Sequence, residues 1–279
     1  MKNYLIITNK QKDTRLALSK HVKTMFESKG ANCTIDYAYR KNDTQPISVP
    51  EGTECILVIG GDGTILNAAS RLIGTNIPLL GINRGTLGFL ADIDVYELDM
   101  TIDDLMADKY QLEKRIMLHA DVYRDGEILG SYKVLNDIVI SHAEVGKVVG
   151  LSVMINDSLS DSYRGDGVII CTPTGATGYN LSAGGPIINP TCRNYLVTPI
   201  CPHSLTTRSV VLAEEDIVTV RVDDLRGTKK AQAVLSFDGK EGMFIRSKDQ
   251  VKIRIAEEET PFIKTKEVSF AKILKEKML

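Results

Sequence analysis

The 279-residue sequence has no tryptophan, no Cys-x-x-Cys pair and no long apolar run. Its five cysteines stand mostly inside apolar segments, which indicates reduced core thiols and argues against a disulfide scaffold or a zinc site. A membrane-spanning helix needs roughly 20 consecutive apolar residues, and no segment approaches that length. The first residues are charged too early for a signal peptide, so we expect a cytoplasmic protein with no membrane contact.

An excess of basic charge is missing as well. The 34 Lys and Arg residues against 36 Asp and Glu residues give a formal net charge of −2. Binding to a phosphate backbone requires clustered Lys and Arg, so the composition argues against a nucleic-acid-binding protein. The basic segment FAKILKEKML at 270–279 indicates instead the solvent-facing side of a short helix.

The first hundred residues alternate the patterns of buried strands and amphipathic helices. A helix begins near Asp13 or Thr14 and stops at Gly30, and another is expected over about 64–73. The strand-like runs are YLIIT at 4–8, NCTIDYA at 32–38, ECILVIG at 54–60 and IPLLGIN at 77–83. This alternation predicts a Rossmann-like α/β domain with a parallel sheet.

From about residue 110 the apolar residues recur with period two, which is typical of strands. Asp125-Gly126 and Asp238-Gly239 are expected to form hairpin turns. The segments with this period are 119–125, 130–142, 150–157, 167–173, 217–224, 233–239 and 251–257. We therefore predict an α/β domain over 1–108, joined again by about 258–279, and a β-rich, β-sandwich-like domain over 109–257. A ligand cleft is expected between the two domains.

The sharpest motif is Gly-Gly-Asp-Gly-Thr at 60–64, between a strand ending at Ile59 and a helix. Such a turn leaves backbone N–H groups free, and its glycines let a phosphate approach closely. It matches neither the Walker A nor the GxGxxG pattern. The Asp62 carboxylate would repel phosphates unless it holds a metal or takes a proton from a hydroxyl, and both roles indicate phosphoryl transfer. The alternative is a tight turn with Asp62 as the helix N-cap.

A second cluster begins at Arg164-Gly165-Asp166-Gly167 and continues in TPTGATGYNLSAGGP at 172–186. These residues are nearly all small or polar, which suits hydrogen bonding to a base, ribose or phosphate, and Tyr179 adds an aromatic face. An ordinary glycine-rich loop is the alternative. Asn136-Asp137 interrupts a strand pattern, which indicates a bulge, a strand edge or a binding site.

Together these motifs resemble those of the NAD kinase family, in the same order, over about residues 1–260. GINRGTLGFL at 81–90, PICPHSLTTRSVVL at 199–212 and SFDG at 236–239 also fit. The GGDGT motif alone is shared with lipid kinases and phosphofructokinases, whereas the 172–187 block is typical of NAD kinases. A lipid or sugar kinase of the wider GGDGT superfamily and a catalytically silent NAD-binding protein stay as alternatives.

The resemblance implies transfer of the γ-phosphoryl of ATP, or of another donor, to the 2′-hydroxyl of the adenosine ribose of NAD. It further implies a divalent cofactor ion, Mg²⁺ or Mn²⁺, and a homotetramer or homodimer whose other partners are small nucleotides. Asp62 would be the catalytic proton acceptor. The substrate-binding residues would be Asp62, Gly63, Asn136, Asp137, Lys147, Arg164, Asp166, Thr174, Thr177, Gly178, Tyr179, Asn180, Leu181, Ser182 and His203.

The sequence departs from the family pattern at four positions. Asp137 and Gly178 stand where many members have Glu and Ala, and Lys240 stands where Gln is frequent. Asn67 replaces a basic residue that some members have. The last two departures leave the preferred phosphate donor open.

Overall fold

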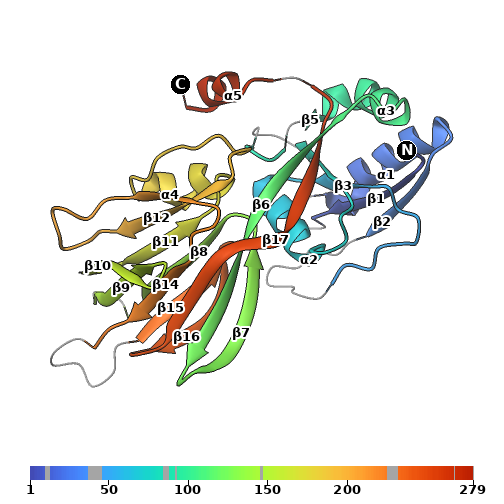
Figure 1. Cartoon of the computed structure of the whole chain (residues 1–279). Helices are drawn as coiled ribbons and strands as arrows, with labels where there is room; N and C mark the ends of the chain where they lie inside the picture. Colours follow the sequence, from blue (N-terminus) through green and yellow to red (C-terminus); the bar gives the residue numbers. More distant parts are fainter. Residues whose placement is uncertain are drawn as a thin grey trace. The chain divides into compact units, whose positions relative to one another are not determined.

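The computed structural model describes residues 1–9, 13–36, 46–83, 88–91, 93–144, 147–224, 232–266 and 268–278. The chain divides into two compact units, which Figure 1 traces from blue to red. Unit 1 comprises Met1–Arg115 and Glu259–Leu279, and unit 2 comprises Ile116–Glu258. The C-terminal segment returns to unit 1, as the sequence predicts. The expected boundary at 108 precedes the observed division because strand β6 (Gln111–Arg124) runs through it.

Unit 1 is built on a parallel sheet with the order β2-β1-β3-β4, which confirms the predicted α/β class. Its strands β3 and β4 are buried along their whole length, as expected where helices cover both faces of a sheet. The short β5 pairs in parallel with β4. The strands are β1 (Asn3–Thr8), β2 (Asn32–Asp36), β3 (Cys55–Ile59), β4 (Leu79–Asn83) and β5 (Ile93–Asp94). Residues 37 and 38 of the predicted second strand lie outside the described residues.

Among its described residues, unit 1 also contains four α-helices and two 3₁₀ turns. The Asp13 carboxylate accepts the N–H groups of Leu18 and Ser19, both at 3.0 Å, and so caps the first helix from outside it. Gly30, at φ +85°, follows its end, as predicted. The elements are η1 (Thr14–Leu16), α1 (Ala17–Ser28), α2 (Asp62–Arg71), η2 (Val95–Glu97), α3 (Leu98–Met106) and α5 (Phe270–Met278).

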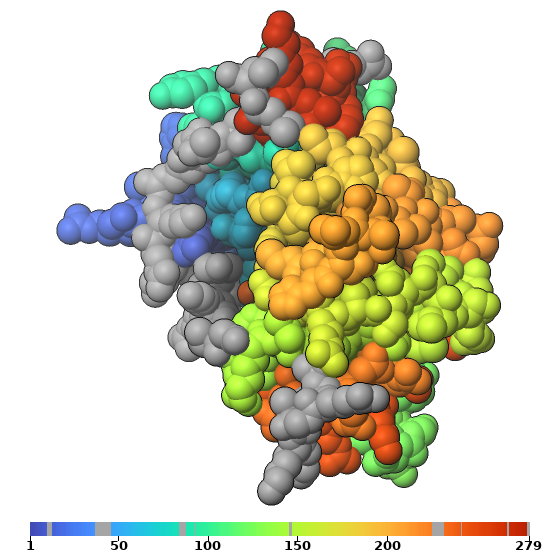
Figure 2. Space-filling view, turned by 90° about the vertical axis from the view of Figure 1, so that its left-hand side faces the viewer, coloured from blue at the N-terminus to red at the C-terminus, as the bar shows by residue number. Residues whose placement is uncertain are grey.

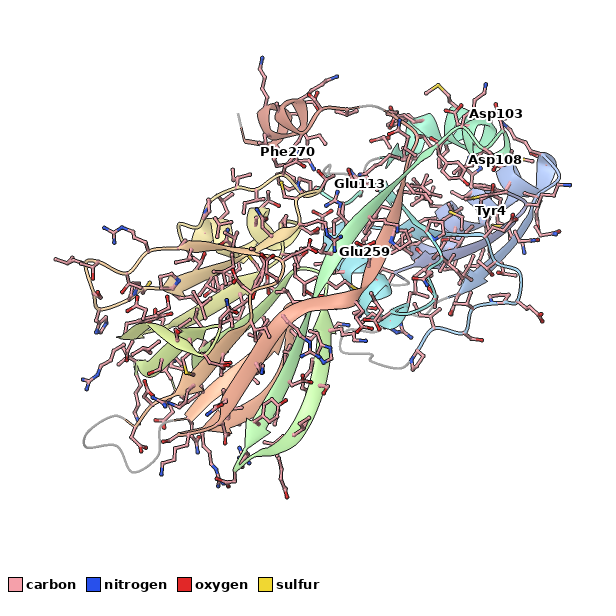
Figure 3. The ribbon with its side chains drawn as sticks, viewed as in Figure 1. Tyr4, Asp103, Asp108, Glu113, Glu259 and Phe270 are labelled. Atoms are coloured by element: carbon pink, nitrogen blue, oxygen red, sulfur yellow. The ribbon has the colours of Figure 1, made fainter. Side chains whose placement is uncertain are left out.

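The core of unit 1 lies between the sheet and its helices. Tyr4 of β1, labelled in Figure 3, packs against Phe26 of α1 with ring centroids 4.4 Å apart. Figure 3 also labels Glu113 and Glu259, on strands β6 and β17 (Gln250–Lys264). Glu113 pairs with Lys264 at 3.7 Å, and Glu259 pairs with Lys114 at 3.4 Å. These ion pairs link β6 to β17 within unit 1.

Unit 2 is a two-sheet sandwich, as predicted. One sheet has the order β10-β9-β14-β17, in which β6 also pairs with β17 and β7 pairs with β6, and the other has the order β13-β12-β11-β8-β15-β16. Apolar side chains of both sheets form one core. The further strands are β7 (Glu127–Val134), β8 (Asp137–His142), β9 (Val149–Ile155), β10 (Ser158–Gly165), β11 (Gly167–Cys171), β12 (Asn194–Ile200), β13 (Val210–Ala213), β14 (Val218–Val222), β15 (Gln232–Phe237) and β16 (Lys240–Arg246).

The turns of unit 2 agree with the sequence in two places and differ in two. Asp125-Gly126 and Asp238-Gly239 form hairpin turns with positive φ at all four residues. A further turn at Asn156-Asp157 was not predicted, and it connects β9 to β10. The run 130–142 is not one strand, because β7 and β8 belong to different sheets and the chain crosses between them at Leu135-Asn136.

Candidate functional site

Asp62 lies in the first turn of α2, directly after the glycines that follow β3. Its Oδ2 accepts the N–H of Phe89 at 2.8 Å, and its Oδ1 accepts the N–H of Leu90 at 3.0 Å. The N-cap of α2 is Gly61, which has no side chain to cap it. The alternative in which Asp62 is the N-cap is therefore wrong, and α2 begins two residues before the predicted 64.

Two glycines make room for this arrangement. A Cβ on Gly88 would lie 1.9 Å from Asp62 Oδ1, so only glycine lets the carboxylate reach the next two N–H groups. A Cβ on Gly60 would lie 2.5 Å from Thr64 Oγ1. Gly88, Phe89 and Leu90 were not predicted as site residues, although Gly-Phe-Leu closes a glycine-rich run after a buried strand. Residues 84–87 of that run lie outside the described residues.

The start of α2 has the geometry of a phosphate site. The N–H groups of Asp62 and Gly63 belong to the first helical turn, where an α-helix offers them no backbone partner. Gly63 is exposed, and a Cβ there would meet nothing within 4 Å. The positive end of the helix dipole adds to the attraction for an anion.

Asn136 and Asp137 lie where the chain enters β8 in unit 2. Asp137 is only 7% exposed, and burial, together with the nearby charge of Asp238, raises the pKa of its carboxyl to about 7. The Oδ1 atom of Asn136 is buried and has no hydrogen-bond partner among the described residues. An acceptor in this state is available to a ligand that donates a hydrogen bond.

The loop after β11 contains η3 (Gly175–Thr177) and the four-residue α4 (Tyr179–Ser182). A Cβ on Gly175 would lie 2.4 Å from the carbonyl oxygen of Asn136, so this loop packs directly on the 136–137 segment. Asn180 is fully buried. Its Nδ2 donates to the carbonyls of Ala176 and Pro186, both at 3.0 Å, and its Oδ1 accepts from Thr198 at 2.6 Å. Its side chain thus holds the loop in shape.

The other predicted residues of this loop lie nearer the surface. Tyr179 is 48% exposed, and its pKa is raised by partial burial and by the charges of Cys201, Asp166 and Asp137. Gly178 and Ser182 are exposed, Thr177 and Leu181 are half-buried, and Thr174 is buried. Figure 2 shows the yellow segment that carries η3 and α4 at the surface of unit 2. An exposed aromatic ring beside carboxylates suits a base or ribose.

Arg164 and His203 are brought together by a hydrogen bond from the His203 N–H to the Arg164 carbonyl at 2.7 Å. Both residues are exposed. Asp166 is half-buried, and its backbone N–H donates to Ile200 at 3.0 Å. Lys147 is exposed and forms an ion pair with Glu144. Asp62 and Gly63 belong to unit 1, and all the other predicted site residues belong to unit 2.

The described residues contain no group of three or more His, Cys, Asp or Glu side chains that could hold a metal ion. Mg²⁺ usually keeps several waters and binds one or two carboxylates together with substrate phosphates. The side chains present fit an ion that is bound chiefly by the phosphates of a nucleotide. Among the helices that the structure describes, none has the length and apolar character to cross a lipid bilayer.

Comparison with known proteins assigns both halves of the chain to one family. Residues 5–110 match the ATP-NAD kinase N-terminal domain, and residues 135–265 match the ATP-NAD kinase C-terminal domain. The NAD kinase of Lachnoclostridium phytofermentans is 38% identical over 281 residues, which cover 99% of each chain. The NAD kinase of Lachnospira eligens is 37% identical over 293 residues, which cover both chains completely.

Solved structures show the same fold. The yeast NADH kinase complexed with NADH superposes with a TM-score of 0.86 at 24% identity, covering 99% of this chain and 87% of that one. An NAD kinase from Archaeoglobus fulgidus in complex with ATP gives a TM-score of 0.74 at 21% identity, covering 94% of each chain.

Proposed function

The chain belongs to the NAD kinase family, and on this premise we propose that Asp62 accepts the proton of the 2′-hydroxyl of NAD. Members of this family are phosphotransferases, and the product here is NADP. The full-length matches favour this family over lipid and sugar kinases. The observation that carries the proposal is the Asp62 carboxylate, which two backbone N–H groups fix at the start of α2.

The chemistry follows from this position. A ribose hydroxyl is a weak nucleophile at neutral pH, so removal of its proton while the new P–O bond forms assists the transfer. Each Asp62 oxygen accepts one N–H and keeps a lone pair for the hydroxyl. The first N–H groups of α2 would bind phosphate oxygens, with the reacting groups held in line.

Unit 2 supplies the side chains that would bind the dinucleotide. The Asp137 carboxylate accepts hydrogen bonds from ribose hydroxyls, and the unpartnered Asn136 Oδ1 accepts from an N–H or O–H of the same substrate. Tyr179 stacks on a base, with Gly178, Thr177, Leu181 and Ser182 around it. Arg164, Asp166 and His203 contact the remainder of the dinucleotide, and Thr174 and Asn180 shape the loop.

We further propose a divalent ion, Mg²⁺ or Mn²⁺, bound to the phosphates of the donor. When bound, it would neutralise the charge that develops on the transferred phosphoryl group. The donor is proposed to be ATP, and the protein is proposed to act in the cytoplasm as a homotetramer or homodimer. Lys147 would reach the substrate only after leaving its ion pair with Glu144.

The test is NADP formation from NAD, ATP and Mg²⁺ by the full chain and by Asp62→Asn. We expect turnover to fall by about 10²–10⁴, the usual contribution of general-base catalysis, with an unchanged circular dichroism spectrum. Asp94→Asn is the matched control, because the Asp94 carboxylate also accepts a backbone N–H, from Tyr96 at 3.1 Å, in unit 1. Near-normal turnover in Asp62→Asn would remove Asp62 from the role of proton acceptor. No NADP from the parent chain would favour a silent NAD-binding protein.

A further inference from the structure

The segment Leu135-Asn136-Asp137 carries the chain from one sheet of unit 2 to the other. A backbone that leaves one ladder and enters another must find other partners for its N–H and C=O groups. All six of these groups are satisfied, and two residues supply every partner. They are Asp238 and Thr172.

Asp238 binds all three N–H groups. Its Oδ2 accepts the N–H of Leu135 at 2.9 Å, and its Oδ1 accepts the N–H groups of Asn136 at 2.7 Å and Asp137 at 3.1 Å. The N–H of Asp238 donates in turn to the Asp137 carbonyl at 3.0 Å. Burial raises the pKa of the Asp238 carboxyl, and these three N–H groups oppose that rise because they stabilise its charged form. Three donors on one side chain hold the segment in place.

Thr172 binds the remaining two carbonyls. Its hydroxyl donates to the Leu135 carbonyl at 2.6 Å, and its N–H donates to the Asn136 carbonyl at 2.9 Å. The same hydroxyl accepts the N–H of Gly175 at 3.2 Å, which joins the segment to the loop that carries Tyr179. Thr172 is fully buried.

The hairpin turn at Asp238 does not explain these bonds. Asp125-Gly126 is a second Asp-Gly hairpin in the same unit, with the same positive φ values. The side chain of Asp125 is 83% exposed, and it forms an ion pair with Arg246 at 3.5 Å. The left-handed turn therefore needs no inward carboxylate, and the three bonds of Asp238 serve the 135–137 segment.

We propose that Asp238 is a positioning residue of the dinucleotide site, whose carboxylate holds the backbone of Leu135–Asp137 so that Asn136 and Asp137 present their side chains to the substrate. This inference rests on the proposed binding of NAD by Asn136 and Asp137. In this role Asp238 acts through the backbone N–H groups that its carboxylate accepts. Its loss should therefore weaken the binding of NAD and leave the binding of ATP unchanged.

The test compares steady-state kinetics of Asp238→Asn with those of Asp125→Asn, the matched change in the other Asp-Gly turn. Asparagine keeps the shape but replaces one acceptor oxygen with an N–H₂ group, which then faces a backbone donor. We expect the KM for NAD to rise at least about tenfold in Asp238→Asn, with the KM for ATP within about twofold of the parent value. Asp125→Asn should change neither constant.

Asn136→Ala and Asp137→Asn separate failure of this inference from failure of the proposed function. If both raise the KM for NAD and Asp238→Asn does not, the positioning role is overturned and the proposed function stands. If neither changes the KM for NAD, the placement of NAD at 136–137 is wrong, and the positioning role is overturned with it.

A second pair of variants covers the case in which Asp238→Asn does not fold. Thr172→Val removes the hydroxyl that bonds the Leu135 carbonyl, and Thr172→Ser keeps it. We expect Thr172→Val to raise the KM for NAD and Thr172→Ser to keep it near the parent value. Equal values of that KM in both variants would show that the hold on 135–137 does not control substrate binding.

Discussion

Two carboxylates, Asp62 and Asp238, accept backbone N–H groups from segments far away in the sequence. Asp62 could be predicted as a site residue because it stands in a glycine-rich strand-to-helix turn. Asp238 could be predicted as a turn residue and as part of the SFDG motif, but its role could not, because the bonds that it makes to 135–137 depend on how β15 lies beside β8. Local sequence patterns carry no signal for such contacts.

Gly88→Ala tests the fit around Asp62. The added Cβ would lie 1.9 Å from Asp62 Oδ1, so the carboxylate or the 88–90 segment must move. We expect kcat to fall at least about tenfold with a smaller change in the KM for NAD, since misplacement of a reacting group by 1 Å can cost about 10² in rate. In an Asp62→Asn background the same change should have little further effect on kcat, because both changes act on one group. An unchanged kcat in Gly88→Ala alone would contradict this account.

Substitutions of Tyr179 test whether the loop that contains η3 and α4 binds the nucleotide. Its half-exposed ring offers an aromatic face, and its hydroxyl offers a hydrogen bond. We expect Tyr179→Ala to raise the KM for NAD about tenfold and Tyr179→Phe to leave it nearly unchanged, since stacking on a base contributes about 1–3 kcal/mol. If both variants raise the KM for NAD equally, the contribution of Tyr179 to NAD binding comes from its phenol hydroxyl. No loss in Tyr179→Ala would place the ring outside the site.

At the scale of secondary structure, most of unit 1 could be predicted because its strands are continuous apolar runs and its first helix lies between Asp13 and Gly30. Unit 2 was harder. The run 130–142 has period two throughout, but the chain changes sheet at Leu135-Asn136. The turn at Asn156-Asp157 was missed because it has no glycine, although both residues adopt positive φ.

A polar cluster joins three strands of unit 2, and it predicts a pH dependence. Burial alone would raise the pKa of Asp121 on β6, but hydrogen bonds from Arg254 on β17, Ser131 on β7 and His119 lower that pKa to about 2. Because the folded pKa lies below the ordinary value, this stabilisation is present above about pH 4 and is lost as the pH falls through about 2.

Asp121→Asn should therefore lower the free energy of unfolding at pH 7 by about 1–3 kcal/mol. The difference from the parent chain should shrink as the pH falls from 4 toward 2. Urea unfolding followed by circular dichroism across this range measures it, with Asp157→Asn in an exposed turn as the control. If the difference in the free energy of unfolding is the same at every pH, the charge on Asp121 does not contribute to stability.

For the whole molecule, the net charge of −2 excludes a broad basic surface, yet the proposed substrates are strongly anionic. Backbone N–H groups can attract such substrates without a basic surface. The first N–H groups of α2 are available to phosphates, and Arg164 is an exposed cation. Lys147, a second cation that the sequence indicates, forms an ion pair with Glu144. Overall charge therefore says little about a site that binds anions through its backbone.

Asp137 links the site to the stability of the whole chain. Burial and the charge of Asp238 raise its pKa to about 7, and Tyr179 and Cys171 are its other titratable neighbours. The folded state keeps a proton that the unfolded state releases between about pH 4 and 7. The free energy of unfolding should therefore fall as the pH rises through this range and level off above it.

Asp137→Asn removes the part of this dependence that Asp137 contributes, because asparagine is neutral at every pH, whereas burial also raises the pKa of Asp238 and its part remains. We expect the variant to match the parent chain near pH 4 and to be more stable by about 2–4 kcal/mol at pH 8, at about 1.4 kcal/mol for each pH unit. The same change should raise the KM for NAD, since the ribose loses a carboxylate acceptor. Urea unfolding at pH 4, 6 and 8, beside Asp157→Asn, gives the comparison. If the free energy of unfolding of Asp137→Asn and of the parent chain changes equally between pH 4 and 8, Asp137 is already ionised in the folded chain at pH 4. Its ionised carboxylate then does not lower the stability of the fold.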